Sequence, residues 1–355
     1  MSDLIDQLVN LDVFVHTEIP IHEIPYLYMP FRELSAIKVE DDMRKSLDNS
    51  SLAMLEGLRG SGKSCASYFV LLNALDAYFP IVITPILEDV NVVCASIEEF
   101  VRLVLQQLTS NISLLPALDK ALIERAKDML AMKVSFTQGK QAGLTAAVRG
   151  LLSILPGILS VEPSVGVDVK KYSEKSLEQK AFNTQRIQCI KELCETIESY
   201  KRKPAFYVDD TDKFLRRPGL DWSKLIPKFF GHIVPALAKI DRPVIIAAHT
   251  YYRRFSAYKE TIKNIVDDRI EIPVINDAAI RSVVDRRINA ASSSHTWQDV
   301  FEQDAMNAIC SHYAEQKTLR QLMGLCRECI HKAQNEGLQK VPLSLVNAAK
   351  AYQEV

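Results

Sequence analysis

The sequence has little of what marks a nucleic-acid-binding, secreted or membrane protein. Its 43 Lys and Arg residues are balanced by 44 Asp and Glu residues, so the formal net charge is −1. No strongly basic field therefore attracts nucleic acid along the whole chain, although a local basic patch is compatible with this balance. The seven cysteines are scattered and odd in number, and no signal-peptide pattern is found. We therefore expect reduced thiols and a cytoplasmic location.

Three further absences narrow the class of protein. The segment Cys326-Arg327-Glu328-Cys329 has C-x-x-C spacing, but no second pair completes a zinc site. The apolar stretch 143–167 is interrupted by Pro156, and its longest uninterrupted run is shorter than the ~20 residues of a membrane-spanning helix. No Asn-Lys-x-Asp motif indicates a guanine nucleotide. We therefore expect no metal centre at these cysteines, no membrane span and no preference for GTP.

The clearest motif that is present is Gly57-Leu58-Arg59-Gly60-Ser61-Gly62-Lys63-Ser64, which has the spacing of a phosphate-binding P-loop. Its glycines allow the backbone to approach an anion closely, and its N–H groups meet phosphates at the start of the next helix. Lys63 would reach the β- and γ-phosphates, and Ser64 would bind Mg²⁺. The predicted nucleotide-binding residues are Gly57, Gly60, Ser61, Gly62, Lys63, Ser64 and Cys65. The alternative is a glycine-rich turn with an incidental lysine.

A second motif, Asp209-Asp210-Thr211-Asp212, follows an apolar run at 203–208. An apolar strand that ends in acidic residues is the Walker B pattern. Asp209 would hold Mg²⁺ through water, and Asp210 has the position of the carboxylate that polarises the attacking water. Many such ATPases have Glu at that position. Asp is one methylene shorter, and a displacement of ~1 Å can cost on the order of 10²-fold in rate, so slow hydrolysis is one expectation. The alternative is a strand that runs into an Asp-rich turn.

The order of the predicted elements is that of an α/β protein. Apolar runs predict buried strands at 52–55, 80–86, 203–208, 243–250 and 270–274. The helical patterns between them, including 65–79 directly after the P-loop, predict a parallel sheet covered by helices. From Asp277 onward every segment has a helical pattern. The expected fold is therefore a P-loop core with a five-stranded parallel sheet, followed by an all-α lid domain.

The same patterns divide the chain into three parts. Residues 1–35 form an extended segment rich in Pro and aromatic residues, 36–275 form the ATPase core, and 276–355 form the lid. Tyr26 or Tyr28 in the extended segment could touch an adenine, or both could be packing residues. The core contains an insertion at about 133–180. Its apolar surface is either an oligomer or partner contact or ordinary packing.

Together these motifs and their order resemble the AAA+ and STAND branch of P-loop ATPases, over roughly residues 35–335. Within this branch the chain most resembles the origin-recognition-like ATPases and the bacterial KAP-like group. Their Walker B strand typically ends in Asp-Asp-x-Asp, which residues 209–212 match. Members of the KAP-like group often have membrane helices between the two Walker motifs. The apolar insertion of this chain is too short for such helices.

The resemblance implies further site residues. His249 or Thr250, at the polar end of the strand 243–250, would be the sensor 1 residue between the two Walker motifs. Arg320 has the position of the sensor 2 arginine, although the Asn-Pro that usually precedes it is missing. Arg269 would be an arginine finger that completes a neighbour's site. The competing arginines are Arg253, Arg254, Arg216 and Arg217, and the alternative for Arg269 is a surface arginine paired with Asp267 or Asp268.

Two functions follow from this resemblance. The first is a Mg²⁺-dependent ATPase that assembles as a homo-oligomer and couples ATP hydrolysis to lid movement and to engagement of a protein partner. The second is an ATP-gated scaffold or switch with slow hydrolysis. A DNA-associated or phage-defence accessory role is suggested by fold analogy alone, and the near-neutral charge does not support it.

Overall fold

The computed structural model describes residues 4–15, 19–84, 97–112, a few positions between 121 and 127, 178–211 and 221–353. The chain divides into two compact units. The lid unit comprises Met1–Asp42, Gly57–Phe69 and Glu271–Val355, and the sheet unit comprises Met43–Glu56 and Val70–Ile270. Most of the insertion 133–180 and the candidate fingers Arg216 and Arg217 lie outside the described residues.

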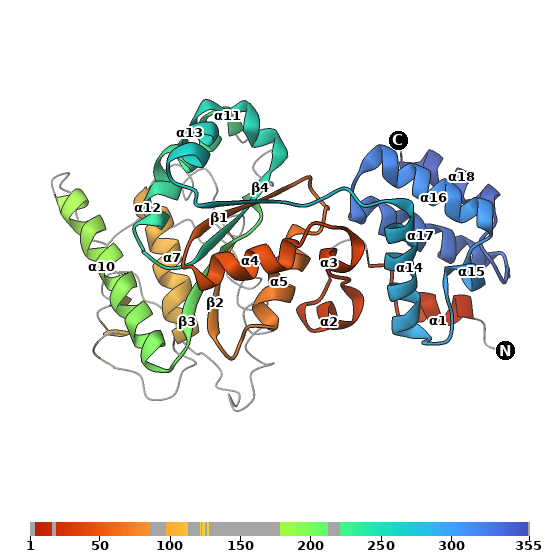
Figure 1. Cartoon of the computed structure of the whole chain (residues 1–355), viewed down its shortest axis with the longest axis horizontal. Coiled ribbons are helices and arrows are strands. Elements are labelled where there is room, and N and C mark those ends of the chain that lie inside the picture. Colours follow the sequence, from red (N-terminus) through yellow and green to blue (C-terminus); the bar gives the residue numbers. More distant parts are fainter. Residues whose placement is uncertain are drawn as a thin grey trace. The chain divides into compact units, whose positions relative to one another are not determined.

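Five strands form one sheet in the order β2-β3-β4-β1-β5 (Figure 1). They are β1 (Leu52–Gly57), β2 (Tyr78–Ile83), β3 (Lys203–Val208), β4 (Val244–His249) and β5 (Asp268–Glu271). β3 pairs in parallel with β2 and with β4, and the whole sheet is parallel. The strand β4 therefore lies between β1, which leads into the P-loop, and β3, which leads into the Walker B motif. The predicted α/β fold with a five-stranded parallel sheet is confirmed.

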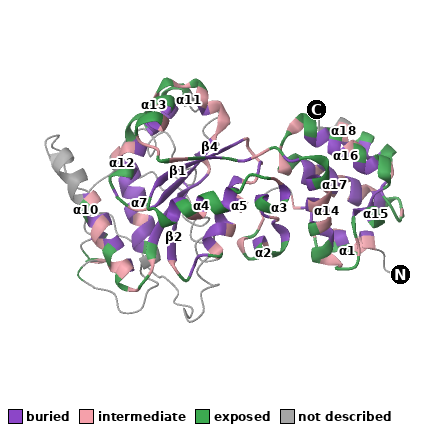
Figure 2. Cartoon of the chain, viewed as in Figure 1, coloured by how far each residue is buried: buried purple, intermediate pink, exposed green. Residues whose placement is uncertain are grey.

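The strands are apolar along their length because both faces of a parallel sheet are covered. Every residue of β1 and β2 is buried, as the purple strands of Figure 2 show. The edge strand β5 differs, since it alternates exposed and buried residues. It also begins two residues earlier than predicted, because the Asp267 N–H already donates to the Leu52 carbonyl at 2.9 Å. Arg269 consequently lies within the strand and not before it.

Helices cover the sheet within the sheet unit, where α7 packs against α10 and β2, and α10 packs against β3. The helices between Val39 and Asn264 are α4 (Val39–Asp48), α5 (Lys63–Leu72), α7 (Ile97–Ile112), α10 (Glu178–Ser199), α11 (Trp222–Lys228), α12 (Val234–Ala238) and α13 (Ser256–Asn264), of which α4 and α5 belong partly to the lid unit. Pro227 lies inside α11, and Pro235 lies in the first turn of α12. A π-helical turn, Phe229–Ile233, joins α11 to α12.

The lid segment after residue 276 is helical, as predicted, apart from one isolated bridge between Phe301 and Val341. Its helices are α14 (Asp277–Ala291), α15 (Trp297–Val300), α16 (Gln303–Gln316), α17 (Leu319–Asn335) and α18 (Leu343–Gln353). A buried stripe runs along these helices (Figure 2). Nowhere in the described part of the chain is a helix both long and apolar enough to cross a membrane.

The prediction of an extended N-terminal segment is wrong. This part contains α1 (Leu4–Asn10), the 3₁₀ turn Ile21–Glu23, α2 (Ile24–Leu27) and α3 (Phe31–Leu34). Its prolines stand at the starts of these short helices, where a missing N–H costs nothing. The helix α1 packs against α17, and Arg327 of α17 donates to both carboxylate oxygens of Asp12 at 2.7 and 3.2 Å. The segment therefore belongs to the lid unit.

Candidate functional site

The P-loop has the backbone that its glycines predict. It follows β1 directly, and α5 begins at Lys63. Gly60 and Gly62 adopt φ values of +77° and +102°, a region that residues with a Cβ rarely occupy. A Cβ on Gly60 would also lie 2.6 Å from the Cβ of Arg320. Both the conformation and the close approach therefore require glycine at position 60.

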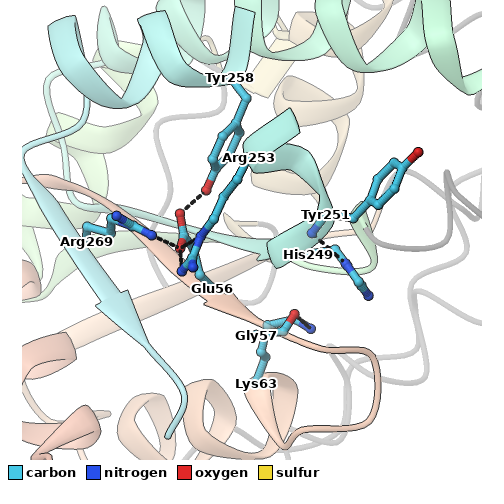
Figure 3. A network of polar contacts seen from close by, with 8 residues as sticks. All are labelled: Glu56, Gly57, Lys63, His249, Tyr251, Arg253, Tyr258 and Arg269. Carbon is cyan, nitrogen blue, oxygen red and sulfur yellow. Dashed lines mark hydrogen bonds and ion pairs between the residues drawn. The ribbon is translucent and has the colours of Figure 1, made fainter. Parts of the chain in front are cut away.

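Polar atoms of the loop suit a phosphate. The Lys63 ammonium is buried and donates to the Gly57 carbonyl at 3.2 Å (Figure 3). It also donates to the Leu58 carbonyl at 2.9 Å. Ser61 is also buried, and its hydroxyl oxygen has no hydrogen-bonding partner among the described residues. A buried polar atom without a partner is costly unless a ligand satisfies it. A cation, an unsatisfied hydroxyl and the N-terminus of α5 thus gather in one loop, which is the donor set that a phosphate needs.

The lid helix α17 begins against this loop within the lid unit. The Arg320 N–H donates to the Gly60 carbonyl at 3.0 Å, and Thr318 caps the helix by accepting from Gln321 N–H at 3.4 Å. The side chain of Leu319 lies 3.3 Å from where a Cβ on Gly62 would be. The structure therefore places Arg320, the predicted sensor 2 residue, beside the P-loop.

The N-terminal segment also reaches the loop, through Phe31, whose ring lies 3.5 Å from the position of a Cβ on Gly62. Glu40 fixes this segment by accepting from the Tyr28 hydroxyl and from the Phe31 N–H, the latter at 2.8 Å. Burial, followed by the charge of Glu40, raises the pKa of Tyr28 well above its usual value. Tyr28 is therefore a packing residue, whereas Tyr26 is 68% exposed.

The Walker B motif lies in the sheet unit, at the end of β3. Asp209 is buried, and its Oδ1 accepts from the Tyr207 hydroxyl at 2.9 Å and from the Asp210 N–H at 2.8 Å. Asp210 is half-buried and has a φ of +56°, a left-handed conformation that Asp tolerates better than most residues. The next residue, Thr211, donates its hydroxyl to the Ala247 carbonyl of β4. The motif is thus tied to the strand that carries the sensor 1 candidates.

The two sensor 1 candidates follow one another at the end of β4. His249 is the last residue of the strand, and its Nδ1 accepts from the Tyr251 N–H at 3.0 Å (Figure 3). Because a neutral imidazole has one donor and one acceptor nitrogen, this bond places the ring proton on Nε2. Thr250 begins the 3₁₀ helix Thr250–Arg254. The geometry gives His249 a defined tautomer, with a donor nitrogen on the side away from that bond.

Two of the arginine-finger candidates, Arg269 and Arg253, share one carboxylate, Glu56, that belongs to none of the sequence motifs. Glu56, the last residue before Gly57, is fully buried, and it accepts from Arg269 at 2.7 Å and from Arg253 Nε at 2.9 Å (Figure 3). The hydroxyl of Tyr258 donates to its other oxygen. Burial alone would raise the pKa of Glu56, but the bonds from Arg269, Tyr258 and Arg253 outweigh burial and lower it.

The alternative partners expected for Arg269 are engaged elsewhere. Asp267 accepts from the Leu52 N–H at 2.8 Å, and Asp268 accepts from the hydroxyls of Ser46 and Ser51 at 2.8 and 2.6 Å.

The finger candidate Arg254 lies over the ring of Tyr251, with 4.6 Å between the guanidinium carbon and the ring centroid. The only available signal for Glu56 was an acidic residue at the end of an otherwise apolar strand.

The strand order β2-β3-β4-β1-β5, the P-loop at the end of β1 and the helices after residue 276 define an α/β P-loop fold. No model of a known protein family matches the chain, and no curated protein matches it in sequence. Among solved structures it is similar to the ORC2 protein of Aeropyrum pernix in its ADPNP–ADP complexes, with 14% identity, a TM-score of 0.49, and coverage of 95% of this chain and 70% of that one.

Two further solved structures are similar. The ORC1 protein of Aeropyrum pernix in complex with DNA has 13% identity and a TM-score of 0.48, with 96% of this chain and 69% of that one covered. The Cdc6p protein of Pyrobaculum aerophilum has 11% identity and a TM-score of 0.46, with 93% and 67% covered.

Proposed function

We propose that the chain binds ATP and Mg²⁺ through its P-loop and Walker B motif, hydrolyses the ATP, and moves its lid with the state of the nucleotide. The contact between the P-loop and α17 supports this most strongly. The Gly60 carbonyl accepts from the Arg320 N–H at 3.0 Å, and Gly60 leaves no room for a side chain against Arg320. A phosphate that rearranges the loop therefore alters the contact on which the lid helix begins.

The proposed roles follow from chemistry and from the sheet. The loop N–H groups, Lys63 and the Ser61 hydroxyl would hold the phosphates, whereas Ser64 and Asp209 would hold Mg²⁺. Bound Mg²⁺ would neutralise charge that develops on the phosphate oxygens. Each of these motifs stands at the carboxyl end of a strand, because Gly57 ends β1, Asp209 follows β3 and His249 ends β4. The carboxyl ends of neighbouring parallel strands meet at one edge of a sheet.

Around the phosphates, Asp210 would orient the attacking water, and His249 or Thr250 would be sensor 1. Arg320 would respond as sensor 2 from the lid. Arg269 would act on a neighbouring copy in a homo-oligomer, where such a cation is worth about 10³–10⁵ in rate. A protein partner would bind the form of the lid that ATP selects.

A second candidate function, an ATP-gated switch with slow hydrolysis, is favoured by the backbone at Asp210. This residue has the shorter acidic side chain, and its N–H is bonded to Asp209 in a left-handed conformation. The side chain of Asp210 is one methylene shorter than that of Glu, and a displacement of ~1 Å can cost on the order of 10²-fold in rate. The DNA-associated role has its support in the ORC1 structure solved with DNA, and steeply salt-dependent binding would identify it.

The rate of ATP turnover and the oligomeric mass in each nucleotide state together test these functions. For the ATPase, we expect Asp210→Asn and Arg269→Ala to bind ATP and lose turnover, while wild type assembles with ATP. For the switch, wild type shows negligible turnover, yet its mass or shape changes with ATP. Absence of both turnover and any ATP-dependent change would contradict both functions. Arg242→Ala is the matched control for Arg269→Ala, because it removes an arginine of the sheet unit that is paired with Glu198 and not with Glu56.

A further inference from the structure

Cys65 is the one half-buried thiol among the described cysteines. The others are all buried: Cys189, Cys194, Cys310, Cys326 and Cys329. Burial also raises the pKa of Cys194 and of Cys329 to about 12, and each unit of pKa lowers the fraction of reactive thiolate about tenfold. Within the described part of the chain, Cys65 is therefore the thiol that an oxidant in solution can reach.

The position of Cys65 in the fold is well defined. It follows Ser64 directly and lies in the first turn of α5, where the helix dipole favours an anion. Phe69 lies one turn further along the same face of α5, since residues i and i+4 of a helix are neighbours. The ring of Phe69 packs against that of Tyr28, with 5.1 Å between the ring centroids. Within the lid unit, the N-terminal segment therefore lies along the face of α5 that carries Cys65.

The N-terminal segment also packs against α14. Two consecutive arginines of α14 bond to its backbone. Arg286 Nη2 donates to the Pro25 carbonyl at 2.9 Å, and Arg287 Nη1 donates to the Val13 carbonyl at 2.8 Å. Arg286 is exposed, whereas Arg287 is only 5% exposed. Arg287 thus lies inside the lid unit, beside the segment that contacts α5.

Arg287 has a neutral partner where a buried guanidinium usually has an anion. Among the described residues its hydrogen bond is to the Val13 carbonyl, and its Nε–H has no partner. Burial lowers the pKa of Arg287 to about 10, and negative charge on Cys65, followed by that of Glu23, opposes this change. A buried cation without an anion is costly. The unused donor of Arg287 therefore suits an anion formed at Cys65.

We propose that hydrogen peroxide oxidises Cys65 to a sulfenate, that the Nε–H of Arg287 holds this anion, and that the modified residue weakens ATP binding at the P-loop. The thiolate attacks one peroxide oxygen, so an S–O bond forms and the O–O bond breaks. The sulfur is oxidised and the peroxide is reduced. The second oxygen leaves as hydroxide, which takes the proton of the new S–OH group to give water and the sulfenate.

The sulfenate opposes ATP binding for two reasons, and this part of the inference rests on the proposed function. It adds a negative charge one residue after Ser64, where the phosphates would bind, and like charges brought together disfavour binding. It also occupies the positive end of α5 that the phosphates would use. Because a sulfenic acid can be returned to the thiol, the effect is reversible.

Peroxide treatment of the full chain, followed by labelling with dimedone, tests the oxidation without reference to ATP. Dimedone forms a stable adduct with a sulfenic acid, and mass spectrometry of the peptides measures the adduct at each cysteine. We expect Cys65 to be labelled at least about 10-fold faster than Cys194 and Cys329, because the raised pKa of those two thiols leaves less thiolate. Labelling of Cys65 no faster than theirs would overturn the proposal.

Arg287→Lys tests the role of the guanidinium, because it keeps a cation and removes the Nε–H. After catalase has removed the peroxide, the lifetime of the Cys65 sulfenate should fall at least about 3-fold, from the lower range for one hydrogen bond. Arg286→Lys is the matched control, because it makes the same change at the exposed neighbour, and it should keep the wild-type lifetime. Equal lifetimes in all three proteins would overturn the assignment of Arg287. Should Arg287→Lys not fold, the labelling rates above and Cys65→Ser still decide the proposal.

Equilibrium ATP binding before and after peroxide tests the regulatory part. We expect the affinity of wild type to fall at least about 10-fold and to recover with dithiothreitol, which removes the added oxygen as water and forms its own disulfide. Cys65→Ser, compared with itself, should show equal affinity before and after peroxide. An equal loss in Cys65→Ser, or no loss in wild type with oxidised Cys65, would overturn this part. Wild type that binds no ATP would refute the proposed function instead, and the labelling of Cys65 would still test the oxidation.

Discussion

Substituting Gly60 with Ala tests whether the P-loop and the lid helix are in direct contact. Gly60 has a φ of +77°, and a Cβ there would lie 2.6 Å from the Cβ of Arg320. The left-handed conformation costs about 1–2 kcal/mol for a residue with a Cβ. Carbon atoms prefer a separation of about 3.5–4.0 Å, so the loop and α17 must part by about 1 Å. Overpacking of this kind costs about 1–3 kcal/mol, which gives a total of about 2–5 kcal/mol.

Gly337 provides the matched control. It has a φ of +67° and no atom within 4 Å of an added Cβ. Gly337→Ala therefore carries the backbone cost of about 1–2 kcal/mol alone. The difference between the two variants isolates the contact with Arg320. In an Arg320→Gly background, where the opposing Cβ is absent, Gly60→Ala should lose that excess, which gives a coupling energy of about 1–3 kcal/mol.

Tryptophan fluorescence during urea unfolding measures these differences. The chain has two tryptophans, and Trp297 is buried in the lid unit. With Trp222→Phe as the common background, Trp297 reports unfolding of that unit alone. If Gly60→Ala and Gly337→Ala lower the free energy of unfolding equally, and Arg320→Gly changes neither, the contact between the loop and the lid does not exist as described.

Three further perturbations test other parts of the site. Tyr207→Phe removes one of the two donors to Asp209 Oδ1 and should cost about 1.5–3 kcal/mol, as for a hydrogen bond to a charged group; an unchanged urea midpoint would contradict it. Glu40→Ala leaves the Tyr28 hydroxyl without its buried acceptor. It should lower the free energy of unfolding of the lid unit, followed by Trp297 fluorescence, by about 1–3 kcal/mol. An unchanged free energy of unfolding would show that other contacts hold the N-terminal segment. The folded-state pKa of Glu56 is lowered from 4.5, so its contribution to stability is present above about pH 4.5 and is lost as pH falls through the folded value. Glu56→Gln should therefore flatten acid unfolding below pH 4.5, and an identical acid limb in both proteins would refute this.

Local sequence patterns correctly predicted those elements whose structure depends on residues close together in the chain. The P-loop backbone, the strand before it and the Walker B strand depend on glycine placement and on apolar runs of about six residues, and the structure confirms these elements. The polar end of β4 was predicted for the same reason. The start of β5 was misplaced because its first hydrogen bond, to Leu52, joins residues more than 200 positions apart.

The Glu56 cluster consists of Glu56, Arg253, Tyr258 and Arg269. It could not be predicted from sequence because its members are far apart in the chain. The Glu56 partners Arg253, Tyr258 and Arg269 are 197, 202 and 213 residues away in the chain. Only the order of the strands, with β5 beside β1, brings Arg269 to Glu56. The short N-terminal helices α2 and α3 were missed for a different reason. Each is only about one turn long and has a proline at its start, and a segment rich in proline is predicted from sequence to be extended.

Calorimetric titration of ATP with Mg²⁺ into wild type and Lys63→Ala tests the central claim most directly. We expect saturable binding of one ATP per wild-type chain. Lys63→Ala should bind at least about 30-fold more weakly, from the ~2 kcal/mol lower bound for removing one member of a buried charge pair. Lys239→Ala, which removes an exposed lysine, should bind as wild type does. Equal binding by all three proteins, or no binding by wild type, would contradict the assignment of a nucleotide site to the P-loop.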